Sequence, residues 1–314
     1  MMLTRRDWLK AAGAAALAAP LSAAPPEDLR ACARKNLKLA VFTGVYAQMP
    51  LEEAVRRIKA DGFRGVGLQY AFADVRFDPL APDWNAAEKI VGAFQNAGIE
   101  IFGQFGYYNV VDPDAERRRG GEARMTALIA NWKRLGSPII STETGTFNPK
   151  SEWLESPKND TEEGYQECRK AFETLARAAE KTGAVIAIEP YWRNVIGSAE
   201  RAERLFRDID SPALKLTMDP CNYFRKEDLP SMKPMLEELF RRVGSQTVVA
   251  HAKDVKAASE GTDLPAAGQG VLDYPLYLRL LARLDKPLYL AVEHLAIDDV
   301  PRARDFVLSQ LDTI

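Results

Sequence analysis

Four residues of the kinds that bind metal ions stand at the ends of apolar runs in the second half of the chain. Each follows a run with the character of a buried β-strand, and in chain order they are Glu189, Asp219, His251 and Glu293. Three carboxylates and one imidazole form an oxygen-rich ligand set that suits Mn²⁺, Mg²⁺, Co²⁺ or Zn²⁺, whereas a structural zinc site would normally include thiolates. Any one of these residues alone is equally well explained as an ordinary polar residue at the start of a loop. Because three carboxylates at one place would repel each other without a cation, we predict a metal site formed by all four residues.

The rest of the sequence indicates how these residues are positioned. From residue 37 onward, short β-rich runs alternate with amphipathic segments, which is typical of parallel strands joined by crossover helices. The predicted strands are residues 37–44, 65–72, 99–107, 138–144, 185–191, 214–219, 247–254 and 287–294. The predicted helices include residues 51–60, 84–97, 161–182, 199–208, 232–243, 274–284 and 300–311.

Eight strands in strict alternation with helices predict an α/β fold, a single-domain (β/α)8 TIM barrel over residues 29–314. An open doubly wound sheet is the alternative, but no Gly-x-Gly-x-x-Gly motif follows the first strand. Barrel enzymes carry their active sites at the C-terminal ends of the strands, where the ends of the last four strands are neighbours. Residues 109–121 form the longest segment without predicted structure, and they could cover this end as a lid.

Other residues at or just beyond the strand ends could contact a substrate. Lys253 lies two residues beyond His251 and should point to the same side of its strand, where its ammonium group could stabilise an enolate oxygen. Pairing of Lys253 with Asp254 or with a carboxylate at the rim is the structural alternative. The remaining candidates could bind hydroxyl groups, stack on a sugar ring or simply pack at the rim, and they are Gln104, Glu143, Trp192, Arg193 and Asn222. His294 directly follows Glu293 and should point away from the interior.

The segments that carry these residues resemble the xylose isomerase-like barrel superfamily, which includes sugar isomerases, epimerases and related lyases. The similarity covers essentially the whole chain after its N-terminal segment. The matching segments are Ile188-Glu189-Pro190, Met218-Asp219-Pro220-Cys221-Asn222, residues 249–254, residues 268–275 and Val292-Glu293. The resemblance implies one divalent metal ion, with Mn²⁺ as the first expectation. It also implies that Glu189 and Glu293 double as proton-transfer bases on opposite faces of the substrate.

The resemblance does not extend to the sugar contacts of one branch of that superfamily. Its ketohexose 3-epimerases carry a His, a Glu and an Arg at the positions where this chain has Asn222, Val195 and Ala257. Their substrate is therefore not expected here.

The first residues resemble a twin-arginine export signal. Arg5 and Arg6 precede Asp7-Trp8-Leu9-Lys10, and a stretch rich in Ala, Gly and Leu follows as far as residue 24. The stretch is too short for a stable transmembrane helix, and the small residues 22–24 form a plausible cleavage region. We therefore expect residues 1–28 to be a signal peptide and short linker, the twin-arginine machinery to be a partner, and the protein to be periplasmic or otherwise exported without stable membrane insertion. An amphipathic cytoplasmic helix is the alternative.

Composition narrows the class of ligand. The formal net charge is -2, and no basic run offers a surface for nucleic acid or an anionic membrane. Two histidines are too few for the multi-zinc site of barrel-fold DNA-repair endonucleases, and three scattered cysteines form no disulfide framework. The expected partner is a small-molecule carbohydrate, and self-association into a homo-oligomer is left open.

These features predict a metal-dependent isomerase or epimerase that transfers a proton through a metal-stabilised enediolate of an unphosphorylated sugar or keto-sugar. A phosphorylated substrate is disfavoured because the sequence has no cluster of arginines and no Gly-rich phosphate loop. A lyase or dehydratase acting on a keto-sugar or keto-glycoside could use the same enolate to expel a leaving group. A non-catalytic barrel that binds a carbohydrate or a partner protein is the alternative of another class. Loss of a metal ligand would favour that alternative, and none is lost.

Overall fold

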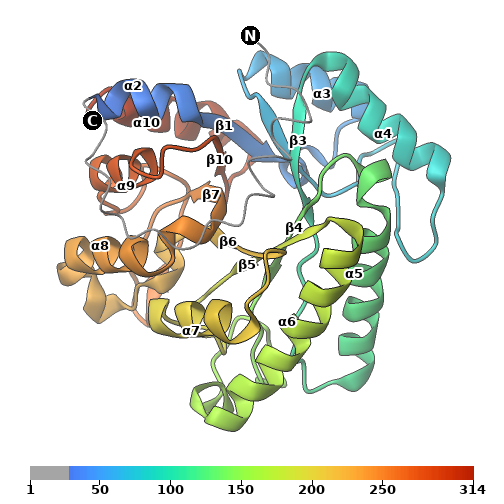
Figure 1. The fold of residues 1–314 in the computed structure, drawn as a ribbon. Helices are drawn as coiled ribbons and strands as arrows, with labels where there is room; N and C mark the ends of the chain where they lie inside the picture. The colour runs from blue at the N-terminus through green and yellow to red at the C-terminus, as the bar shows by residue number, and fades with distance from the viewer. Residues whose placement is uncertain (1–27) are drawn as a thin grey trace.

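Eight parallel strands close into one barrel in the computed structural model, which describes residues 28–314 (Figure 1). The order around the barrel is β1-β10-β7-β6-β5-β4-β3-β2, so the chain winds steadily around it. The strands are β1 (Leu37–Phe42), β2 (Gly65–Leu68), β3 (Glu100–Phe105), β4 (Ile139–Glu143), β5 (Val185–Glu189), β6 (Leu214–Met218), β7 (Thr247–Ala252) and β10 (Leu288–Val292). The single-domain TIM barrel is thereby confirmed, and the predicted signal segment lies outside the described residues except for Asp28.

Helices surround the barrel, and each predicted helix matches one of them closely. They are α2 (Leu29–Asn36), α3 (Leu51–Ala60), α4 (Trp84–Ala97), α5 (Ala115–Leu135), α6 (Glu162–Thr182), α7 (Ala199–Ile209), α8 (Met232–Val243), α9 (Tyr274–Ala282) and α10 (Val300–Leu311). The two ends of the described chain lie side by side, since α2 packs beside α9 and α10 (Figure 1). Arg30 on α2 donates to the backbone carbonyl of Ile314 at 3.0 Å, which joins the N-terminal helix to the C-terminus.

The prediction that residues 109–121 form an irregular lid is wrong. Helix α5 already begins at Ala115, where Asp114 caps it by accepting from the backbone amides of Glu116 and Arg117. Residues 109–112 are buried, and the side chain of Asn109 accepts from the amide of Thr146 at 3.0 Å. The segment is therefore anchored to the neighbouring loop, and it is not a free flap.

The interior of the barrel is filled by side chains. The rings of Phe102 and Tyr289 stack with centroids 5.2 Å apart. Glycines on β2 make room for large neighbours, because a Cβ atom at Gly65 would lie 2.4 Å from the ring of Tyr289 and one at Gly67 would lie 2.5 Å from the ring of Phe42. The barrel is thus a packed core, and the room for a ligand lies at the C-terminal ends of the strands.

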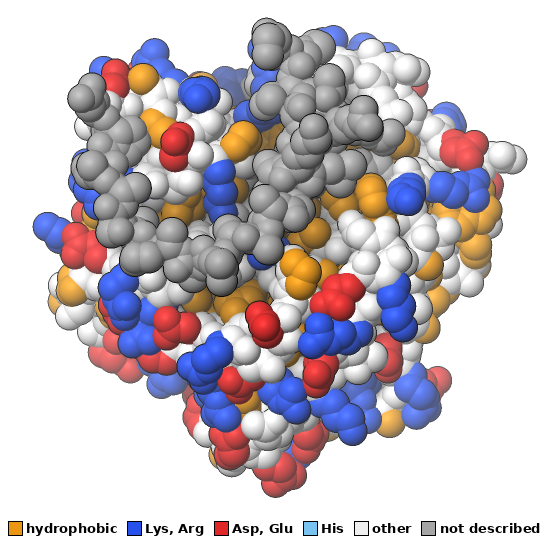
Figure 2. Space-filling model, in the orientation of Figure 1, with side chains coloured by type: hydrophobic (Ala, Val, Ile, Leu, Met, Phe, Trp, Pro, Cys, Tyr) orange, Lys and Arg blue, Asp and Glu red, His pale blue; other side chains and the backbone are white. Residues whose placement is uncertain are grey.

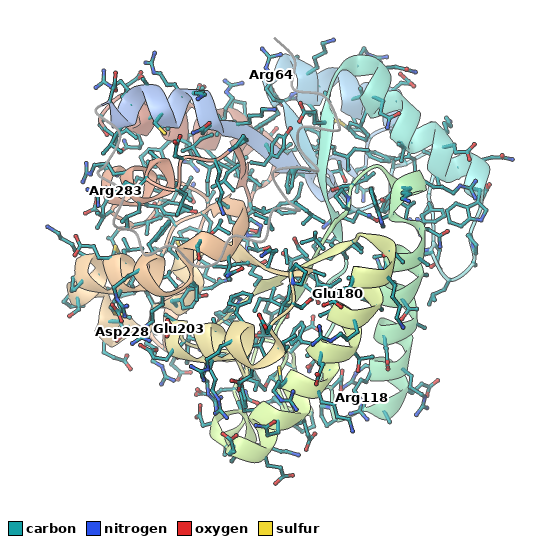
Figure 3. All side chains as sticks on the ribbon, in the orientation of Figure 1. Arg64, Arg118, Glu180, Glu203, Asp228 and Arg283 are labelled. Carbon is teal, nitrogen blue, oxygen red and sulfur yellow. The ribbon has the colours of Figure 1, made fainter. Side chains whose placement is uncertain are left out.

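The surface is charged and mixed. On the face shown in Figure 2, basic and acidic side chains are interspersed over the helices. Charged side chains such as Arg64, Arg118 and Arg283 lie at the outside of the molecule (Figure 3). Within the part of the chain that the structure describes, no helix has the length and apolar character needed to cross a bilayer.

Candidate metal centre

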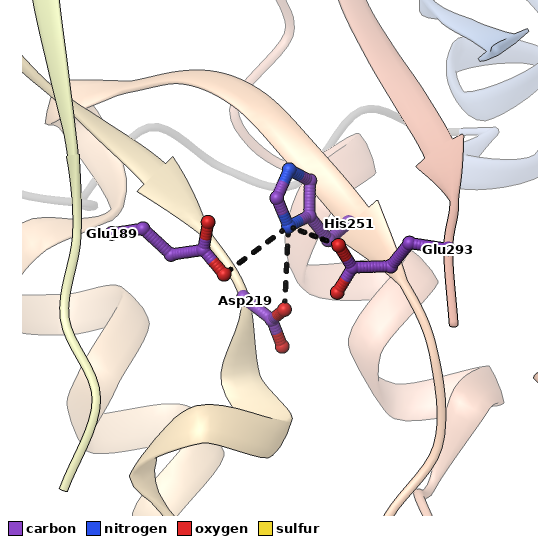
Figure 4. Close-up of side chains that lie close together, drawn as sticks. All are labelled: Glu189, Asp219, His251 and Glu293. Carbon is purple, nitrogen blue, oxygen red and sulfur yellow. Dashed lines mark hydrogen bonds and ion pairs between the residues drawn. The ribbon is translucent and has the colours of Figure 1, made fainter. Parts of the chain in front are cut away.

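The four predicted metal ligands come together at the C-terminal ends of four adjacent strands (Figure 4). Glu189 is the last residue of β5, Asp219 directly follows β6, His251 lies near the end of β7, and Glu293 directly follows β10. Each of the four offers one ligand atom, and these atoms all lie within 4.8 Å of one another.

The geometry centres on the imidazole. His251 Nδ1 lies 3.4 Å from Glu189 Oε1, 3.3 Å from Asp219 Oδ2 and 3.3 Å from Glu293 Oε2 (Figure 4). The four side chains are at most 13% exposed. Three carboxylate oxygens and one imidazole nitrogen, converging in a buried position, fit a divalent cation of the first transition row or Mg²⁺.

Neighbouring groups orient the ligands, as is usual at metal sites. Asn222 donates to Glu189 Oε1 at 2.8 Å, and the hydroxyl of Tyr107 donates to Glu189 Oε2. The backbone amide of Cys221 donates to Asp219 Oδ1 at 3.1 Å. The two oxygens of Glu189 are therefore held by different donors, which fixes the plane of its carboxylate.

Lys253 forms ion pairs with two of the carboxylates. Its Nζ atom lies 2.7 Å from Asp219 Oδ2 and 2.8 Å from Glu293 Oε1, and its side chain is 3% exposed. Of the two predicted structural alternatives, pairing with rim carboxylates is therefore the one observed. Asp254 has another role, because it accepts from the backbone amides of Val255, Gly268 and Leu272 and so shapes the loop after β7.

Burial and charge act against each other throughout this cluster. Burial lowers the pKa of His251, but the negative charges of Glu293 and Glu189 outweigh it and hold the pKa well above its usual value. Burial raises the pKa of Glu293, but the cationic His251 and Lys253 outweigh that effect and hold it well below its usual value. Burial likewise lowers the pKa of Lys253, and Asp219 and Glu293 raise it well above normal. The site thus favours positive charge, and a metal ion would compete with the proton on His251 Nδ1.

A cavity of about 560 Å³ opens directly above this cluster. Glu189, Glu293 and Lys253 line it, whereas Asp219 and His251 are almost fully buried beneath it. Two further residues predicted to contact a substrate, Glu143 and Asn222, also line the cavity. Its other walls are made largely by residues that sequence reasoning missed, among them Phe42, Gln69, Phe105, Tyr107, Trp153 and Tyr191.

Gln104 is predicted to contact a substrate, but the structure places it elsewhere. Phe105 and Tyr107 on the same strand and its extension line the cavity, and alternation along a strand turns Gln104 to the opposite side. There its side chain accepts from the hydroxyl of Tyr70 at 3.0 Å and donates to the backbone carbonyl of Ser137. It joins the barrel to its outer layer.

Trp192 and Arg193 are also placed outside the cavity. Two guanidinium groups lie over the ring of Trp192, with Arg193 at 4.5 Å and Arg225 at 4.9 Å from the ring centroid. Tyr191, one residue earlier, is the aromatic residue of this loop that lines the cavity. His294 has left-handed backbone geometry, with φ of 56°, and its Nδ1 atom lies 2.6 Å from the carbonyl of Leu264. It lies at the cavity wall without joining the four-residue cluster.

Glu143 lies beside Glu189 across the β4–β5 pairing. Burial, and then the charge of Glu189, raise the pKa of Glu143 to about 8 from the ordinary 4.5. The folded protein therefore holds a proton that the unfolded chain releases, and the stability that this proton contributes is lost as the pH rises from about 4.5 to about 8.

This shift leads to a prediction for Glu143→Gln. As the pH rises from 5 to 8, the unfolding free energy of the wild type should fall by about 2–4 kcal/mol more than that of the variant, because the variant has no proton to lose at this position. Urea unfolding of EDTA-treated protein at the two pH values measures this difference. Equal pH dependence in the two proteins would show that the Glu143 carboxyl is ionised in the folded state.

Comparison with known proteins gives a consistent picture of the fold. A family model described as "Xylose isomerase-like TIM barrel" matches residues 55–307. Comparison with curated protein sequences gives no match.

Three solved structures illustrate the similarity. A xylose isomerase-like TIM barrel protein from Mycobacterium smegmatis, crystallised in complex with magnesium, is 17% identical, with a TM-score of 0.66 over 90% of this chain and 98% of that one. The 3-keto-D-glucoside 4-epimerase from E. coli is 20% identical, with a TM-score of 0.62 over 89% of this chain and 99% of that one. A probable 3-DHS dehydratase from Bacillus anthracis is 14% identical, with a TM-score of 0.66 over 87% of this chain and 98% of that one. At these identities the likeness shows a shared fold.

Proposed function

Because the chain belongs to the xylose isomerase-like TIM barrel family, we propose that it is a divalent-metal-dependent isomerase or epimerase of an unphosphorylated sugar or keto-sugar. The observation that carries the proposal is that two residues of the cluster are buried and two line the cavity. Asp219 and His251 are buried beneath the cavity, whereas Glu189 and Glu293 line it from strands separated by two others. Two of the four ligands are therefore open to a substrate, and both are carboxylates able to carry a proton.

The two glutamates are prepared differently for proton transfer. Glu189 is held by hydrogen bonds from Tyr107 and Asn222, while Glu293 is paired with Lys253. One carboxylate takes the proton from the carbon beside a carbonyl group, and the other returns it. Return to the opposite face of that carbon gives an epimer, and return to the neighbouring carbon gives an isomer.

Glu189, Asp219, His251 and Glu293 would hold a divalent ion, which would supply Lewis acidity for the negative charge that develops on the carbonyl oxygen. Mn²⁺ is our first choice among the ions that the donor set fits. The ammonium group of Lys253 lines the same cavity, and beside its two ion pairs it would add positive charge for an oxygen bound there.

The lining of the cavity supports a substrate without phosphate. Among residues 28–314, no arginine lines it, and its lysine is already paired with two carboxylates. A phosphate group would find acidic neighbours and no free guanidinium group to bind it.

We further propose export through the twin-arginine machinery, on the ground of the Arg5-Arg6 pair and the apolar stretch that follows, and action in the periplasm, where unphosphorylated sugars occur.

A lyase or dehydratase on a keto-sugar or keto-glycoside is the second candidate. The same proton abstraction gives elimination when a leaving group stands on the next carbon. The structural neighbours named above include both a keto-glucoside epimerase and a probable dehydratase, which supports keeping both reactions as candidates. A barrel that only binds carbohydrate is less well supported, because all four ligands are retained and converge.

Solvent-deuterium exchange separates these possibilities. The Mn²⁺-loaded protein is incubated in D₂O with a panel of unphosphorylated sugars and 3-keto-sugars, and the products are examined by NMR and mass spectrometry. Deuterium at carbon without loss of atoms indicates isomerisation or epimerisation, and loss of water or an aglycone indicates a lyase. A protein that binds sugars from the panel but exchanges no proton on any of them would overturn the proposal in favour of a binding module.

A further inference from the structure

Trp153 is a large apolar side chain that the fold leaves in contact with solvent. It lies in the loop between β4 and α6, and it is 53% exposed. About half of the Trp153 surface is therefore free to be covered by a ligand. Aromatic rings in that position are suited to stacking against the apolar face of a sugar or another ring.

The loop that carries Trp153 is ordered by its own hydrogen bonds. Thr146 Oγ1 donates to the carbonyl of Leu154 at 2.8 Å, and Asn148 Nδ2 donates to the carbonyl of Glu155 at 2.8 Å. The amide of Trp153 itself donates to Ser151 Oγ at 3.2 Å. On the side of the cavity, the Trp153 ring faces Tyr191 edge-on, with centroids 6.5 Å apart. The exposed position of the ring is therefore built into the loop.

Trp153 is the one residue shared by two cavities. The first is the 560 Å³ cavity above the metal centre, and the second has a volume of about 290 Å³. The first alone is within the range of about 300–1,000 Å³ that holds an entire small ligand, which is more room than a single sugar ring needs. Trp153 therefore lies at the boundary between the cavity above the metal centre and the second cavity.

The second cavity has a different chemistry. Apart from Trp153 its lining is polar, and the charges balance, with Arg117 and Lys150 opposite Asp112 and Glu152. Arg117 and Asp112 are joined by two hydrogen bonds of 2.9 Å, so the guanidinium group that lines this cavity in the described part of the chain is already paired. Such a surface suits a neutral group with many hydroxyls, since each hydroxyl can donate to a carboxylate and accept from a cation or an amide.

We propose that Trp153 and the second cavity form a subsite for a second sugar ring, so that the substrate is a glycoside of at least two rings. The inference rests on the proposed function for the first ring, which lies at the metal centre. The second ring stacks on the Trp153 indole, and its hydroxyl groups contact the polar side chains beyond.

Sugar affinities test the subsite with a readout that does not depend on detecting a product. Isothermal titration calorimetry of the Mn²⁺-loaded protein compares glucose with cellobiose, maltose and trehalose. At least one disaccharide should bind about tenfold more tightly than glucose, and Trp153→Ala should weaken disaccharide binding more than glucose binding, so that the ratio of the two affinities falls to about one. Trp153→Phe, which keeps an aromatic face, should retain most of the disaccharide advantage, and Lys150→Ala should weaken only the disaccharide.

Leu154→Ala is the matched control, because Leu154 is the next residue on the same loop, is also exposed, and lines neither cavity. It should leave all affinities unchanged. The subsite is refuted if every disaccharide binds no more tightly than glucose, or if Trp153→Ala keeps the disaccharide advantage. Failure of the deuterium exchange with a Trp153-dependent preference intact would instead refute the catalytic proposal and leave the subsite standing.

Discussion

Glu189→Gln is expected to lower the rate of solvent-deuterium exchange by about 10²–10⁴-fold, the range typical for loss of a general acid or base. Glutamine preserves the size of the side chain and can still accept a hydrogen bond from Asn222. It can neither carry the proton nor supply negative charge to a cation. The affinity for Mn²⁺ should therefore fall as well. Exchange rates are measured at saturating Mn²⁺, so that the loss of the base is seen separately from the loss of the metal.

Glu143→Gln is the matched control for this substitution. Glu143 is the neighbour of Glu189 on the adjacent strand and lines the same cavity, yet it is outside the four-residue cluster. The control variant should bind Mn²⁺ as the wild type does, because it leaves all four ligands in place. An unchanged exchange rate in Glu189→Gln would show that Glu189 is not one of the two bases.

Lys253→Met should lower the unfolding free energy of the metal-free protein by about 3–5 kcal/mol, as expected when one partner of a buried ion pair is removed. Without the Lys253 ammonium, Asp219 and Glu293 remain buried beside Glu189 with too little positive charge among them. Added Mn²⁺ should recover much of the loss, because the ion supplies the missing charge at the same carboxylates. Urea unfolding with EDTA and with Mn²⁺ measures both effects.

Lys89→Met controls for the removal of a lysine. Lys89 forms an exposed ion pair of 3.6 Å with Asp74, and its loss should cost less than about 1 kcal/mol with or without metal. If Lys253→Met were as mild as Lys89→Met in EDTA, the carboxylates would not depend on Lys253 for their charge balance.

The barrel and its four-residue cluster could be predicted because both follow from repeating rules. Parallel strands in a barrel bring their C-terminal ends together, so polar residues that end successive apolar runs must be neighbours. Successive side chains of a strand point to opposite sides, and this rule correctly placed Lys253 on the side of His251. Applied to β3, it would also have turned Gln104 away from the cavity and pointed to Tyr107, two residues beyond Phe105.

The start of helix α5 and the position of Trp153 could not be predicted from a repeating sequence pattern. The first half of α5 is polar and contains Gly120 and Gly121, and its buried residues begin only at Met125, so no apolar periodicity marks the start of the helix. The position of Trp153 depends on hydrogen bonds between side chains and backbone within a loop, and these have no sequence period. Contacts made by loops over the barrel mouth therefore had to come from the structure.

The amount of metal that the protein retains tests the account most directly. Wild-type protein is stripped with EDTA, loaded with excess Mn²⁺ and desalted, and its manganese is counted by inductively coupled plasma mass spectrometry. We predict one ion per chain in the wild type and in Glu143→Gln, and far less than one in Asp219→Asn, which removes the charge of a ligand buried beneath the cavity. A wild-type protein that keeps no manganese or other divalent ion, or an Asp219→Asn variant that keeps a full equivalent, would contradict a metal centre at this cluster.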